Sequence, residues 1–287
     1  MSSKLVNLVL FVLILCPSMI FGQRMSLKEA VEKDIVNVEI TDNGKSQGEK
    51  NISFTINNMT REPVDLLLNA GMLVDPVNPD LQDHVITQSM LVSLEPLEKA
   101  TYDAYGMCTQ GSKGGPKEGD QYIIGGPISE ELAKVVKLIE RNSYQDGTGQ
   151  NAVWAITDRA NIAGIYDESD PARSKALAEF VADVRGEDVP WYNVVYEEHE
   201  SDERMFTGDV ARLDAIFRYS LIATSKITFG IYHPNGEPLQ VYFEDRVRPK
   251  GNHRLKFTFE ATGIKHGTYH VKLFSEGVLI EDRPVEL

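Results

Sequence analysis

Alternation of apolar and polar residues fills an early stretch of the chain and predicts short β-strands there. The strand-like runs lie at 36–40, 52–56, 64–68, 85–87 and 90–94. Residues rich in Asn, Gly, Asp and Pro separate them, as expected for turns. We therefore predict a small β-sandwich over residues 36–105.

A second set of strands is predicted near the end of the chain. Its apolar runs lie at 227–232, 239–243, 255–259, 269–273 and 278–285. Glycine-containing turns recur between them at roughly ten-residue spacing, which favours a second β-sandwich over 211–287.

Helical periodicity appears only between these two regions. Leu132, Val135, Val136 and Ile139 fall on one helical face, after a Ser129 that is suited to cap the helix. We predict two further helices. Thr148 would cap the one over 150–158, and Asp170-Pro171 would begin the other.

The predicted fold class is thus mainly β with a helical insert, in which two sandwiches flank a small helical module over 106–190. Within that module, the Gly- and Lys-rich segment 106–126 is expected to be loop, and the acidic range 191–210 is expected to be a linker. A short helix is expected at 27–32.

The first 22 residues have the pattern of a cleaved secretory signal. A positive start with Lys4 precedes the apolar run 5–15, and a helix breaker and small residue follow before Gln23. The run is too short for a spanning helix. Lipidation at Cys16 and an uncleaved anchor are the alternatives. We expect a secreted or envelope protein with no membrane insertion after cleavage.

The net charge of the chain limits the classes of partner that it can bind. The chain carries a formal net charge of −14, without a basic cluster interleaved with aromatics. Nucleic acids and anionic lipid surfaces are therefore disfavoured, and we expect a protein or glycan surface partner.

Cysteine usage singles out one residue. After signal cleavage, Cys108 is the only cysteine left, so an internal disulfide is excluded. In an oxidising compartment it is an intermolecular bridge, an inert buried thiol or a reactive group.

Two segments around this cysteine resemble the bacterial thioester domain. The stretch from Gln150 to Trp154 is similar to its TQxA-type motif, with Gly149 in place of the Thr. Tyr105-Gly-Met-Cys108 is similar to its cysteine segment, although Met107 stands where an aromatic usually precedes Cys. The resemblance covers residues 100–160.

This resemblance implies a covalent bond between the Cys108 sulfur and the Gln150 side-chain carbonyl. Such an acyl sulfur group is electrophilic and can be attacked by a partner's amine. Water must be excluded until then, and Trp154 and Tyr105 are the candidate shielding residues. The alternative is a buried small cysteine packed near an ordinary core tryptophan.

The final region resembles the immunoglobulin-like domains of flagellar hook-capping proteins and of secretion sorting signals. The resemblance rests on the Asn235-Gly236 hairpin, the Pro249-Lys-Gly251 turn and the late Gly267-Thr-Tyr269 strand. It implies a spacer or a sorting domain.

Other chemistry has weaker support. The acidic run 196–203 lacks an organised calcium loop, and His233, His253, His266 and His270 have no ligand spacing, so no metal is predicted. No hydrolase, metalloprotease or phosphate-loop motif occurs, and no cofactor is expected. The sequence predicts a non-enzymatic binding or adhesion protein, with a non-covalent scaffold as the alternative.

Overall fold

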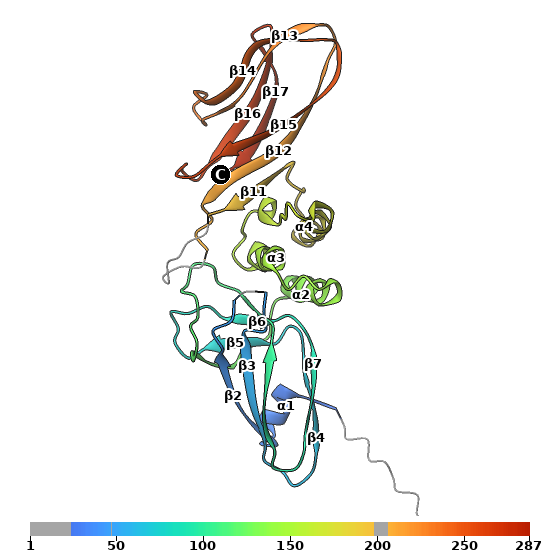
Figure 1. Ribbon diagram of the computed structural model, residues 1–287, viewed down its shortest axis with the longest axis vertical. Helices are drawn as coiled ribbons and strands as arrows, with labels where there is room; N and C mark the ends of the chain where they lie inside the picture. Colours follow the sequence, from blue (N-terminus) through green and yellow to red (C-terminus); the bar gives the residue numbers. More distant parts are fainter. Residues whose placement is uncertain (1–23, 47, 198–205) are drawn as a thin grey trace, which may run out of the picture.

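The computed structural model describes residues 24–46, 48–197 and 206–287 of the chain. It is mainly β, with 44% strand and 19% helix, which confirms the predicted fold class in its coarse form. Figure 1 shows an elongated arrangement, with the early strands at one end, helices in the middle and the later strands at the other end. The predicted signal, residues 1–22, lies outside the described residues.

The first region contains two sheets and a short helix. Its elements are β1 (Met25–Ser26), α1 (Leu27–Glu32), β2 (Val36–Asp42), β3 (Ile52–Asn58), β4 (Val64–Leu68), β5 (Leu73–Pro76), β6 (His84–Ile86), β7 (Met90–Leu94), β8 (Lys99–Ala104), β9 (Gly106–Cys108) and β10 (Gln121–Ile124). One sheet has the order β1-β4-β7 and the other β8-β3-β2-β10-β5-β6-β9. Side chains of both sheets and of α1 share one hydrophobic cluster.

Three helices follow the second of these sheets. They are α2 (Glu130–Asn142), α3 (Gly147–Thr157) and α4 (Pro171–Arg185), with a short 3₁₀ turn η1 (Ile162–Gly164) before α4. Val85 of β6 and Met107 of β9 belong to the helices' hydrophobic cluster. One edge of the large sheet is therefore packed directly on the helical module.

Two more sheets form the end of the chain. Their strands are β11 (Tyr192–Tyr196), β12 (Val210–Leu221), β13 (Ser225–Tyr232), β14 (Pro238–Arg248), β15 (Gly251–Glu260), β16 (Thr268–Ser275) and β17 (Val278–Glu286). The orders are β11-β12-β15 and β14-β13-β16-β17, and both sheets share one cluster that includes Phe217, Phe229 and Phe257.

Helix starts were predicted with mixed success. Ser129 and Asp170 cap α2 and α4, as predicted. The prediction for the middle helix was wrong, because the Asp146 side chain accepts the N–H groups of Thr148 and Gly149 and α3 begins at Gly147. A carboxylate competes well for this position, and Thr148 lies already inside the helix.

Two predicted irregular segments contain strands. The range 106–126, expected to be loop, includes β9 and β10, whose pairing partners β6, β2 and β5 are distant in sequence. The start of the range 191–210, expected to be linker, is β11, which pairs with β12. Its residues 198–205, which hold most of the acidic run, lie outside the described residues.

Candidate functional site

Cys108 ends the edge strand of the seven-stranded sheet. In the β6–β9 ladder it lies directly opposite His84. The backbone bonds of this ladder fall on either side of the pair, from Thr109 N–H to Asp83 O at 3.0 Å and from Thr87 N–H to Tyr105 O at 2.9 Å. The N–H and C=O groups of Cys108 therefore point away from β6, toward the open edge.

Gln150 fills that open edge. Its side-chain Oε1 accepts the Cys108 N–H at 2.9 Å, and its Nε2 donates to the Cys108 carbonyl at 2.7 Å. Gln150 is 1% exposed and Cys108 5%. Two residues earlier, the Gly106 N–H donates to the Asn51 side-chain Oδ1 at 2.8 Å. The structure thus brings together the two residues named from sequence.

Gln150 reaches the strand because of how α3 begins. Asp146 caps the helix, so residue 150 lies in its first turn, facing β9. Gly149 permits this approach, because a Cβ added there would lie 1.9 Å from the Tyr144 carbonyl oxygen. The Thr of the family motif has no room at this position.

His84 is the site residue that sequence reasoning missed. Its Nε2 lies 3.4 Å from the Cys108 Sγ, and its ring packs edge-on against Tyr122 of β10. Its side chain is 0% exposed, and Nδ1 has no hydrogen-bond partner among the described residues. Only the β6–β9 register brings the two residues together, and neither strand has a strong sequence pattern.

The buried site disfavours the charged forms of both Cys108 and His84. Burial, with a smaller contribution from the Asp42 carboxylate, raises the pKa of the Cys108 thiol to about 12. Burial also lowers the pKa of His84 to about 4, partly opposed by the backbone of Gln82. At neutral pH the pair is therefore a neutral thiol beside a neutral imidazole. A standing thiolate–imidazolium pair, which a cysteine hydrolase uses, is disfavoured.

A cavity of about 430 Å³ leads to these side chains. Cys108, His84 and Gln150 line it, with Asp42 and Glu118 among the charged residues of its wall. Burial raises the pKa of Asp42, and Asp120 and Glu118 raise it further. Lys45 and Lys117 also line the cavity, so its charged wall residues are two carboxylates and two ammonium groups.

The two predicted shielding residues are elsewhere. Trp154 is buried, but its ring stacks on Phe206 with centroids 4.7 Å apart, and it does not line the cavity. Tyr105 is partly exposed, and the Lys50 ammonium lies over its ring. Neither residue is among those that line the cavity, because Trp154 lies one helical turn beyond Gln150 and Tyr105 precedes β9.

Within the described ranges, no group of three or more His, Cys, Asp or Glu side chains is arranged to hold a metal ion. No helix in these ranges has the length and apolarity to cross a bilayer.

Known family models, curated proteins and solved structures give no match to this chain.

Proposed function

We propose that this chain is an exported surface or periplasmic binding protein in which Cys108 and Gln150 form an internal thioester. The observation that carries the proposal is the docking of the Gln150 amide on the Cys108 backbone, at 2.9 and 2.7 Å, with both side chains buried. The two bonds hold the carboxamide beside the backbone of the residue that bears the sulfur, which brings the two reacting residues into one buried place.

The bond would form by a balanced exchange. The Cys108 sulfur attacks the Gln150 side-chain carbonyl carbon, the carbon–nitrogen bond breaks, and ammonia leaves with the thiol proton. An amine of the partner later attacks the same carbon. The partner's amine nitrogen then forms an amide with the side chain of residue 150. The proton that the amine loses passes to the sulfur, which leaves as the free Cys108 thiol.

The buried site tolerates this product. The thioester is neutral, as are the thiol and the amide from which it forms, so its formation places no charge in the buried site. Among the described residues, His84 Nε2 is placed 3.4 Å from the sulfur and could pass the thiol proton on, but its pKa, lowered to about 4, makes it a weak base for this step.

The attacking group would be an amine, because an amine converts a thioester to an amide. The cavity wall holds the carboxylates Asp42 and Glu118 and the ammonium groups of Lys45 and Lys117, so its formal charges balance. A protein lysine or an amino sugar on a partner surface has this chemistry. The reaction happens once per molecule, so the proposed role is adhesion and not enzymatic turnover.

The proposed architecture is that of an adhesin-like stalk. In each terminal region two sheets share one hydrophobic cluster, which supports a β-sandwich. The order of the last two sheets, three strands facing four, supports an immunoglobulin-like spacer or sorting domain. The signal-like segment 1–22 would export the chain.

The second candidate is a non-covalent scaffold. The same Gln150 bonds satisfy the outward N–H and C=O groups of an edge strand, which is a structural role in itself. In that case Cys108 is an inert buried thiol, consistent with its raised pKa.

Intact mass separates the two candidates. The purified mature protein should be about 17 Da lighter than its sequence, because ammonia has left. Methylamine should convert this species to one about 14 Da heavier than the sequence, and free one thiol. Cys108→Ala and Gln150→Ala should each retain the full mass and take up no methylamine.

A different outcome supports the scaffold. If the wild-type mass is unshifted, and iodoacetamide leaves Cys108 unlabelled in the folded protein but labels it completely in denaturant, no thioester exists and the thiol is free and buried.

A further inference from the structure

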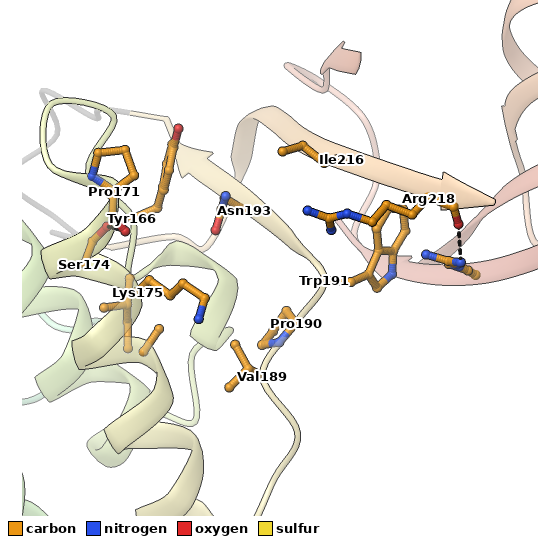
Figure 2. A pocket seen from close by; sticks show the side chains of 13 residues that line it. Tyr166, Pro171, Ser174, Lys175, Val189, Pro190, Trp191, Asn193, Ile216 and Arg218 are labelled. Atoms are coloured by element: carbon orange, nitrogen blue, oxygen red, sulfur yellow. Dashed lines mark hydrogen bonds between the residues drawn. The ribbon is translucent and has the colours of Figure 1, made fainter. Parts of the chain in front are cut away.

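A second cleft lies between the helical module and the C-terminal strands. It has a volume of about 390 Å³, within the range of small-molecule sites. Figure 2 shows Lys175 of α4 and Arg218 of β12 entering it from opposite sides. Pro190 and Trp191, from the segment before β11, and Asn193 of β11 lie between them. It shares no lining residue with the Cys108 cavity.

The cleft is positive in a negative protein. Lys175, Arg218 and Arg283 line it and no carboxylate does, although the chain carries a net charge of −14. Lys175 also pairs with Glu179. Arg283 is fixed: its guanidinium lies 4.4 Å from the centre of the Phe217 ring, donates one N–H to the Arg218 carbonyl and pairs with Glu281 at 3.4 Å.

Arg218 is the available cation. Within the described residues its guanidinium has no ion pair and no side-chain hydrogen bond, and the residue is exposed. It lies directly opposite Arg254 in the β12–β15 ladder. Like charges in this position repel, and an anion bound at Arg218 relieves the repulsion. A guanidinium binds a carboxylate through two parallel hydrogen bonds.

The other residues that line the cleft, an indole ring and two polar side chains, can contact a sugar ring. Trp191 is partly exposed, and its indole is held in place by a hydrogen bond from Nε1 to the Pro284 carbonyl at 3.1 Å. The Arg283 guanidinium already lies over this ring, 5.6 Å from its centre, and the apolar face of a pyranose would pack on the part of the ring that is still exposed. Neither the Asn193 amide nor the Tyr166 hydroxyl has a hydrogen-bond partner among the described side chains, and both line the cleft. They can bind sugar hydroxyls.

We propose that this cleft binds a carboxylated sugar, a uronic acid or a similar acidic glycan end. The carboxylate binds Arg218 with support from Lys175, the ring lies on Trp191, and the hydroxyls reach Asn193 and Tyr166. The site is independent of the thioester, and it would give the protein a non-covalent contact with an acidic glycan surface.

Titration calorimetry of the full mature chain with D-glucuronate tests the proposal. We expect a dissociation constant on the order of 1 mM, as is reasonable for one sugar in an open cleft, and no heat with D-glucose. Arg218→Ala should weaken binding by about tenfold or more, and Arg218→Lys by less, because a lysine keeps the charge and loses the paired geometry.

Arg61→Ala is the matched control, since it removes the same charge from an exposed position in the turn between β3 and β4. It should bind glucuronate as the wild type does. Equal binding of glucose, an unchanged affinity in Arg218→Ala, or an equal loss in Arg61→Ala would overturn the proposal. Preference for glucose 6-phosphate over glucuronate would overturn the assignment of a carboxylate.

Discussion

Replacing Gly149 with alanine should be among the most damaging single-methyl changes in this chain. The added Cβ would lie 1.9 Å from the Tyr144 carbonyl oxygen and 3.0 Å from Met107 Cε. Non-bonded heavy atoms prefer about 3.5 Å, so the helix start and the preceding turn must separate by about 1.5 Å. The turn is not free to move, because the same Tyr144 oxygen accepts the Asp146 N–H at 2.9 Å.

The displacement reaches the site through the next residue. Gln150 makes its bonds to Cys108 at 2.9 and 2.7 Å, and a shift of this size breaks both. Overpacking costs about 1–3 kcal/mol, the two lost bonds about 1 kcal/mol each, and alanine's better helix propensity returns about 1 kcal/mol. We expect the free energy of unfolding to fall by about 2–4 kcal/mol.

Gly147→Ala is the matched control. Gly147 is two positions earlier on the same helix, and a Cβ there meets nothing within 4 Å. This variant should be neutral or more stable by up to about 1 kcal/mol. Urea unfolding of both variants measures the difference, and intact mass reports whether ammonia is still lost. If Gly149→Ala unfolds at the same urea concentration as Gly147→Ala, the close packing argued here is wrong.

Two further changes test the site. His84→Gln should reduce the acid sensitivity of stability. The unfolded His84 takes up a proton near its ordinary pKa of 6.5 and the buried one only near 4, so stability falls as pH drops through this window. The difference is worth about 3 kcal/mol, measurable by urea unfolding at pH 7 and pH 4.5, and an unchanged pH dependence would refute it. Asp146→Ala should cost about 2 kcal/mol, because it removes the acceptor for the Thr148 and Gly149 N–H groups and the Arg173 ion pair. Burial acts to raise the pKa of Asp146, but bonds from Thr148 and Arg173 lower it overall, so its contribution should be lost as pH falls into the acid range. A thermal midpoint equal to the wild type at pH 7 would contradict this role, and Asp146→Asn should retain most of the cap.

Local pattern was enough to find the elements that carry strong periodicity. The apolar positions Leu132, Val135, Val136 and Ile139 are all buried on one face of α2, as predicted. The long strands β13 to β17 also lie where alternation and glycine turns indicated them. In these segments each residue's burial follows from its own neighbours in sequence, so the pattern is readable without the fold.

Short strands that form only by pairing with distant strands could not be predicted from local sequence pattern. Strand β9 has three residues, and β10 lies in a Gly- and Lys-rich stretch. Both exist because distant strands offer hydrogen bonds to them. Hence the range around Cys108 was expected to be loop, although it is the edge of the largest sheet.

The sequence by itself determined the residue types of the candidate site, Cys108 and Gln150, and a helix that includes the glutamine. Only the tertiary structure decided that their atoms meet, that His84 stands beside the sulfur, and that Trp154 faces Phe206 instead. Strand register and helix docking set these contacts, and both depend on packing between segments far apart in the chain. The positive cleft at Arg218 has the same origin, since its cations come from α4, β12 and β17 and form a site only once these elements are packed together.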